Sequence, residues 1–126
     1  MSDTSLGQEA AAVTARFPRH TYTLPETTRE LESDPSTVTL RQLTIEEEQA
    51  ALAAAKAKNV DFSYEGAMRS LVAADGKPLT WTGDEVERFF RGLSNKVRDC
   101  VVQAFQRLAI PTRKESEDFL ASEKIE

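Results

Sequence analysis

The chain has 126 residues, of which 40% are hydrophobic, and its formal net charge is −5. This length suits one domain with a modest core, and the acidic balance argues against nucleic acid as the main ligand, because phosphate binding relies on Lys and Arg. The single cysteine, Cys100, excludes an intramolecular disulfide and fits a reducing cytosol. Without an apolar run near the roughly 20 residues that span a bilayer, we expect no membrane association.

The N-terminal part of the chain divides into a polar tail and an extended segment. Residues 1–18 are mostly small and polar and lack both a buried face and the pattern of a secretory signal, so we expect a disordered tail, or weak helix around residues 9–15. In residues 19–43, a β-branched and aromatic run ends at Pro25, and a later run alternates apolar and polar residues through Val38 and Leu40. We therefore expect a β-hairpin or extended segment that rests on the helices that follow.

The next two elements read as helices. Thr44 and Glu47 form the pattern of a capping box, which predicts a helix over residues 45–58. We expect Ile45, Leu52 and close packing of alanines to hold it. A second helix is predicted over residues 63–73, because apolar residues recur there at helical spacing. The dipeptide at residues 75–76, Asp-Gly, either ends this helix or makes a tight turn.

Further helices follow to the C-terminus. Thr82 and Glu85 form a second capping box, and apolar residues then recur at spacings of three and four, which predicts helices over residues 83–92 and 95–109. After Pro111, a third capping box begins a last short helix with Phe119 and Leu120 facing inward. The sequence thus predicts a mainly α fold, in which a short N-terminal β-ribbon precedes a helical domain over residues 44–126, a bundle of about five short helices.

The chain offers no clear constellation for chemistry. His20 and Cys100 are the only residues of their types, and Cys100 lies on an apolar face, where a free cysteine usually packs as a small hydrophobic residue. The acidic residues 46–48 suit the positive end of a helix better than a metal site. The turn at residues 75–77 lacks the remainder of a phosphate-binding loop. We therefore expect no catalytic residue, no cofactor and no metal site.

Two features point toward protein binding. Trp81 either fastens a loop onto the helices or anchors a partner. Between residues 88 and 114 there are seven basic residues and one acidic residue. These charges form either a solvated helix face or a basic surface that meets acidic segments of another chain, or of a second copy of this one. A third reading, DNA binding, lacks a helix-turn-helix pattern.

Residues 37–122 resemble the tail assembly chaperones of long-tailed bacteriophages. The likeness rests on the runs TVTLRQLTIEEEQAA and SLVAADGKPLTW, on the helix entry LSNKVR, and on an aromatic-rich helix that runs to Pro111. The resemblance implies a non-enzymatic protein of the host cytoplasm that coats the tape measure protein while the tail tube polymerises. It also implies the tail tube protein as a second possible partner, through a frameshifted longer form.

A chaperone of this kind would shield the exposed apolar surface of a long helical partner. We therefore expect partner binding by a set of apolar residues, with nearby basic residues steering acidic partner segments: Met68, Trp81, Phe89, Phe105, Arg88, Arg91, Lys96 and Arg98. The main alternative is a tail or baseplate component that stays in the virion. A small DNA-binding regulator is the third reading.

Overall fold

The computed structural model describes residues 17–79 and 83–124. Residues 1–16 of the expected N-terminal tail, the candidate residue Trp81 and the capping residue Thr82 lie outside the described residues.

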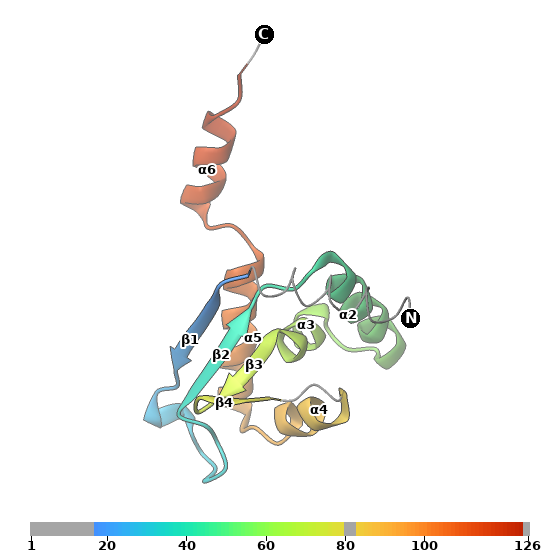
Figure 1. The fold of residues 1–126 in the computed structure, drawn as a ribbon, viewed down its shortest axis with the longest axis vertical. Helices are drawn as coiled ribbons and strands as arrows, with labels where there is room; N and C mark the ends of the chain where they lie inside the picture. The colour runs from blue at the N-terminus through green and yellow to red at the C-terminus, as the bar shows by residue number, and fades with distance from the viewer. Residues whose placement is uncertain (1–16, 80–82, 125–126) are drawn as a thin grey trace, which may run out of the picture.

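Four strands form one antiparallel sheet in the order β1-β2-β3-β4 (Figure 1). Their bounds are Arg19–Thr23 for β1, Thr37–Arg41 for β2, Leu71–Ala74 for β3 and Lys77–Pro78 for β4. The expected hairpin of residues 19–43 is the β1–β2 pair, whose connection carries a short 3-10 helix, η1, at Glu26–Thr28.

The register of the sheet places apolar side chains on the side covered by helices. Tyr22 lies opposite Val38, and His20 lies opposite Leu40, whose side chain is fully buried. The alternate residues Thr21 and Thr39 point away from the helices, and their hydroxyl oxygens lie 2.9 Å apart in a hydrogen bond. Because side chains alternate along a strand, one face of this sheet is apolar and the other is polar.

The predicted mainly α fold, a β-ribbon followed by a five-helix bundle, is wrong. Residues 71–78 form β3 and β4 within the range expected to be helical, and β3 pairs with the second edge of β2. The helix predicted over residues 63–73 ends at Ser70, and Leu71 already has extended backbone angles. Pairing with β2 satisfies backbone groups of that strand, and this tertiary gain overrides the helical spacing of the apolar residues. The fold is therefore mixed α/β.

The turn between β3 and β4 explains the Asp-Gly dipeptide. Asp75 and Gly76 have φ angles of 51° and 76°, which is the pattern of a two-residue type I′ hairpin turn. The same Asp75 carboxylate accepts the backbone N–H of Ser36 at 2.7 Å and of Thr37 at 3.1 Å. The turn therefore joins the start of β2 to the β3–β4 hairpin, a role that no local pattern predicts.

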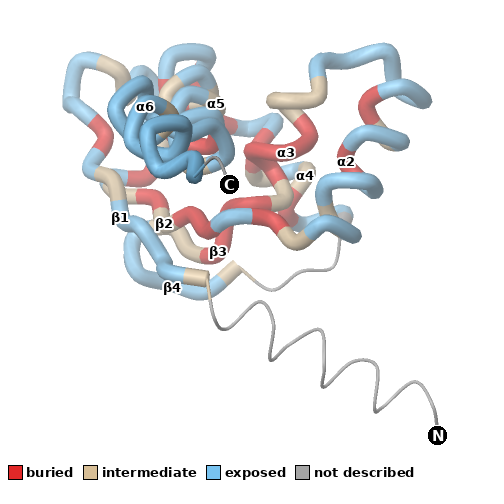
Figure 2. Tube along the Cα trace, turned by 90° about the horizontal axis from the view of Figure 1, so that it is seen from above, coloured by how far each residue is buried: buried red, intermediate tan, exposed pale blue. Residues whose placement is uncertain are grey.

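Among the described residues, the α-helices are α2 at Ile45–Lys58, α3 at Phe62–Ser70, α4 at Gly83–Arg91, α5 at Asn95–Ala109 and α6 at Arg113–Ala121. The predicted bounds of α2 and α5 are confirmed. Thr44 and Glu47 make both hydrogen bonds of the predicted capping box, and α2 ends where Asn59 adopts the left-handed conformation, with φ 56°. Helices α3, α4 and α5 all lie on one side of the sheet (Figure 2).

The core lies between the sheet and helices α3 and α5. Val38 and Leu40 of β2 belong to the same buried cluster as Phe90 of α4 and Phe105 of α5. Gly66 of α3 permits this packing, because a Cβ atom added there would lie 2.3 Å from Cζ of Phe105. An alanine at this position would force the buried ring to move, so α3 and α5 approach closely only with glycine at residue 66.

Candidate protein-binding site

The apolar residues predicted to bind a partner lie mainly in the core. Met68 and Phe105 are buried, and Phe89 is half-buried against the same cluster. The Phe105 ring meets Phe62 edge-on, with 6.1 Å between the ring centroids. These side chains therefore hold α3, α4 and α5 together and present little surface to another molecule. Trp81 lies outside the described residues.

Arg98 holds the junction of α4 and α5. Its guanidinium donates to the backbone carbonyls of Phe90 at 3.2 Å, Arg91 at 3.0 Å and Leu93 at 2.7 Å, and also to the Asn95 side chain at 3.0 Å. The last carbonyls of a helix lack partners within that helix, and a long cationic side chain can satisfy them. These contacts occupy the guanidinium, so we assign Arg98 to the fold instead of to partner steering.

The other three predicted basic residues are exposed. Arg88 donates to the Asp84 carbonyl of its own helix at 3.3 Å, Arg91 pairs with Glu87 at 2.8 Å, and Lys96 lies 3.6 Å from Glu30 of the β1–β2 connection. Exposed pairs of this kind contribute little to stability, about 0–1 kcal/mol each. Arg88, Arg91 and Lys96 therefore remain on the surface of α4 and α5. Met68 and Phe105 do not, so the predicted basic and apolar residues do not form one binding surface.

A buried carboxylate joins α3 to its neighbouring helices. Glu65 is 1% exposed, and its Oε1 atom lies 2.9 Å from Nζ of Lys58, which also reaches Glu87 at 3.3 Å. The hydrogen bond from Lys58 to Glu65 is the main reason that the pKa of Lys58 lies above its ordinary value of 10.5. This network links α2, α3 and α4, so we assign these charged side chains a role in holding the fold together.

The outer face of α2 carries exposed apolar side chains. Ile45 is 73% exposed and Leu52, two turns later, is 47% exposed. The prediction that these two residues hold the helix is wrong, because α2 buries Ala51 and Ala55 instead. Small alanines allow α2 to approach α3 closely, which leaves the larger side chains of α2 outside. We call Ile45 and Leu52, with Gln49 between them, the α2 face.

Helix α6 projects from the rest of the molecule (Figure 1). It buries none of its residues, and its apolar side chains Phe119 and Leu120 are 75% and 67% exposed. The prediction that they face inward is therefore wrong. Its predicted capping box is confirmed, with the Thr112 hydroxyl accepting the Glu115 N–H at 3.1 Å. The helix thus forms through its cap and presents an apolar face with Ser116, Phe119 and Leu120, the α6 face.

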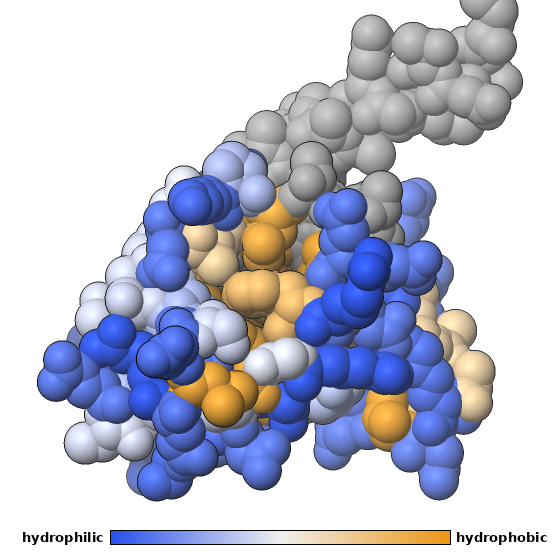
Figure 3. Space-filling view, turned by 90° about the horizontal axis from the view of Figure 1, so that it is seen from below, coloured by the Kyte–Doolittle hydropathy of each residue, from blue (hydrophilic) through white to orange (hydrophobic). Residues whose placement is uncertain are grey.

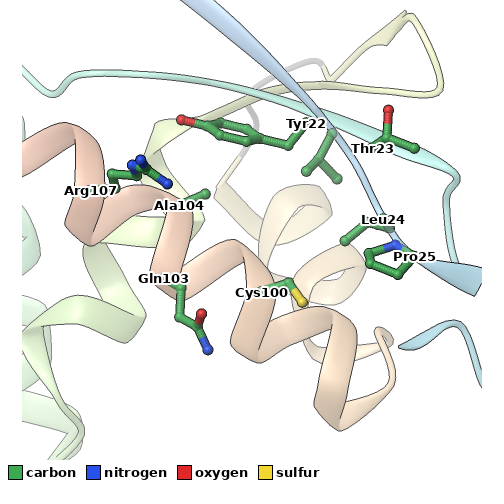
Figure 4. Close-up of a pocket in the computed structure, with 9 residues that line it drawn as sticks. Tyr22, Thr23, Leu24, Pro25, Cys100, Gln103, Ala104 and Arg107 are labelled. Carbon is green, nitrogen blue, oxygen red and sulfur yellow. The ribbon is translucent and has the colours of Figure 1, made fainter. Parts of the chain in front are cut away.

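A pocket of about 300 Å³ opens between β1 and α5 (Figure 4). Its apolar wall comes from Tyr22, Leu24 and Val38 on the sheet side and from Ala104 on α5. Thr23 and Pro25 also line the pocket, as do Cys100, Gln103 and Arg107 of α5, and in Figure 4 Cys100 lies along one wall. This β1–α5 pocket is a concave, mainly apolar site with an amide and a guanidinium among its lining side chains.

The described residues also indicate which kinds of site to set aside. No group of three or more His, Cys, Asp or Glu side chains within residues 17–79 and 83–124 could hold a metal ion. Nor does any helix in these two ranges have the length and apolarity that a membrane crossing needs. On the face opposite α6, apolar residues gather near the centre, with hydrophilic residues to both sides and below them in the view of Figure 3.

Comparison with known proteins returned no match among protein-family models, curated proteins or solved structures.

The sequence contained signals for two of these surfaces. The wide spacing of large apolar residues in α2, with alanines between them, is a weak sign that the alanines pack inward and the larger residues do not. In α6, the pair Phe119 and Leu120 stands among charged residues with no further apolar turn, which leaves too small a face for a core helix. The β1–α5 pocket had no such signal, because its walls come from segments about 60 to 85 residues apart in the chain.

Proposed function

We propose that this protein is a non-enzymatic tail assembly chaperone, which holds the tape measure protein of a long-tailed phage in the host cytoplasm before the tail tube encloses it. The sequence resemblance of residues 37–122 motivates the proposal. The observation that carries it is the α2 face, where Ile45 and Leu52 remain exposed on one side of the helix while Ala51 and Ala55 are buried on another.

A helix of this composition suits a helical partner. Ile45 and Leu52 lie seven residues apart, two helical turns, on one side of α2. Helix-to-helix recognition of this type relies on apolar anchors spaced by whole turns. A tape measure protein, which is long and helical, would present such a surface before its enclosure.

The test uses co-expression with the phage's own tape measure protein and capture through an affinity tag on the chaperone. Leu52→Glu and Ile45→Glu should each weaken capture by about tenfold or more, because burying one such side chain is worth roughly 1.5–3 kcal/mol. Ala50→Glu is the matched control, since Ala50 is also exposed on α2 but lies on the other side of its exposed surface. Equal capture by all four proteins would contradict the proposal.

A further inference from the structure

We propose that the α6 arm, residues 110–121, of one copy of this chain docks in the β1–α5 pocket of a second copy. The arm inserts Phe119 and Leu120, and the pocket receives them beside Tyr22 and Cys100, two lining residues that are only partly buried. This inference concerns self-association and stands apart from the proposed partner of the α2 face.

The arm has apolar surface that its own chain does not cover. Ile110, Phe119 and Leu120 are all more than 60% exposed, so covering them would remove apolar surface from water. An exposed apolar helix face of this kind marks a site of association in a folded protein. Its capping box keeps the helix formed and ready to bind.

The linker directs the arm away from its own pocket. Ile110 has φ −115° and ψ 128°, which is the extended conformation that a following proline imposes. Thr112 has φ −66° and ψ 163°, which its role as the N-cap of α6 requires. Two of the three linker residues are thus held extended for local reasons, and α6 projects away from α5 instead of folding back along it (Figure 1). The α6 arm that docks in the pocket therefore belongs to a second copy of the chain.

The pocket matches the arm in size and in charge. About 300 Å³ is the lower end of the range for ligand pockets, which is enough for one or two apolar side chains. Arg107 lines the pocket, and within the described part of the chain no ion pair involves it. Glu115 of α6 lies one turn before Phe119, and Glu123 lies just past the end of the helix, four residues after Phe119. Docking would bring these carboxylates to the guanidinium of Arg107.

The native thiol in the pocket provides a direct test. Cys100 is the only cysteine in the chain, so a second cysteine on the α6 face can trap the contact as a disulfide. Tagged Leu120→Cys/Cys100→Ser protein is mixed with untagged wild-type chain and oxidised. The expected product is a covalent heterodimer joined through Cys100. Lys114→Cys in the same background is the matched control, because Lys114 lies on the opposite side of α6 and should give much less product.

Light scattering after size-exclusion chromatography gives an independent measurement. Wild-type protein should show a mass above that of one chain, and Phe119→Asp should show the mass of one chain with its circular dichroism unchanged, since Phe119 is exposed. Arg107→Glu should weaken association about tenfold, and Glu123→Arg in the same chain should restore much of it.

Three results would overturn the inference: a wild-type mass of one chain at every concentration tested, equal trapping at residues 114 and 120, or Arg107→Glu associating as well as wild type. Leu52→Glu separates this inference from the proposed function. It should lose the tape measure protein and keep the disulfide-trapped heterodimer, whereas Phe119→Asp should lose self-association.

Discussion

At the scale of single residues, Arg98 shows how one long cationic side chain can hold a helix junction. Its guanidinium reaches the carbonyls of Phe90, Arg91 and Leu93, which belong to the end of α4 and the turn into α5. Hydrogen bonds to a charged group are roughly twice as strong as neutral ones, and these carbonyls have no partner of comparable strength. The sequence alone groups Arg98 with the basic residues that would steer a partner, because charge, unlike burial, is visible in a sequence.

Replacing Arg98 should therefore affect stability more than a similar change at an exposed site. We expect Arg98→Ala to lower the free energy of unfolding by about 2 kcal/mol, because it removes several charge-assisted hydrogen bonds at once. Urea unfolding followed by circular dichroism would measure the loss. Arg88→Ala is the matched control and should change stability by about 0.5 kcal/mol or less, because Arg88 is exposed and bonds only within α4. Equal losses in the two variants would refute the role assigned to Arg98.

At the scale of elements, α6 and α2 both begin with a capping box but differ in how far they pack against the rest of the fold. Each begins with a capping box, at Thr112 for α6 and at Thr44 for α2. Helix α2 also packs Ala51 and Ala55 against the body, whereas α6 buries no residue. A helix of nine residues is marginal in water, so the stability of α6 depends on its cap.

Removing each cap should expose this difference. Thr112→Ala should reduce hydrogen-exchange protection in α6 about fivefold, since an N-cap contributes about 1 kcal/mol. Thr44→Ala should lower global stability by a similar amount and leave α2 folded, because its buried alanines hold it in place. Mass-spectrometric hydrogen exchange, at a concentration where the chain is monomeric, would measure both. Unchanged exchange in α6 of Thr112→Ala would show that contacts other than the cap support the helix.

At the scale of the whole molecule, two carboxylates join separate layers of the fold. Glu47 of α2 accepts two hydrogen bonds from Arg41 of β2, at 2.8 Å and 2.7 Å. Asp34 of the β1–β2 connection accepts the backbone N–H of Ser94, at the start of α5, at 3.0 Å. Partial burial would raise the pKa of each group, but these hydrogen bonds outweigh it. The pKa of Glu47 therefore lies below its ordinary value of 4.5, and that of Asp34 below 3.8.

The whole fold should accordingly lose stability in acid. Both carboxylates have a lower pKa in the folded chain than in the unfolded chain, so the unfolded state binds more protons as the pH falls. Their contribution is complete above about pH 4.5 and is lost as the pH falls through the folded-state values. Urea midpoints measured from about pH 7 to about pH 3 should decline in wild type. The decline should be shallower in the double variant Glu47→Gln/Asp34→Asn, and parallel profiles would contradict this explanation.

Much of the local structure follows from neighbouring residues in the sequence. The bounds of α2 and α5, the caps at Thr44 and Thr112, and the β1–β2 pair agree with the sequence-based predictions. These features depend on hydrogen bonds and steric preferences within a few residues, which a sequence displays directly. The hairpin turn at Asp75 and Gly76 was visible in the same way, although its two short strands were not.

The candidate binding surfaces were only partly predictable, because they depend on contacts between segments that are far apart in the sequence. Sequence periodicity shows which residues are apolar, but contacts with distant segments decide which of them are covered. Met68 and Phe105 disappear into the core, whereas Ile45 and Phe119 remain outside it. An isolated helical pattern cannot distinguish these cases, because its apolar residues are spaced alike in both.

The sequence by itself determined where α2, α5 and α6 begin and that residues 19–43 are extended. Only the tertiary structure decided that Leu71–Ala74 is a strand, that Ile45 and Leu52 stay outside the core, and that the α6 face stays exposed. The physical reason is the range of the interactions. Caps and turns are stabilised within one turn of chain, whereas strand pairing and burial depend on segments that lie tens of residues away.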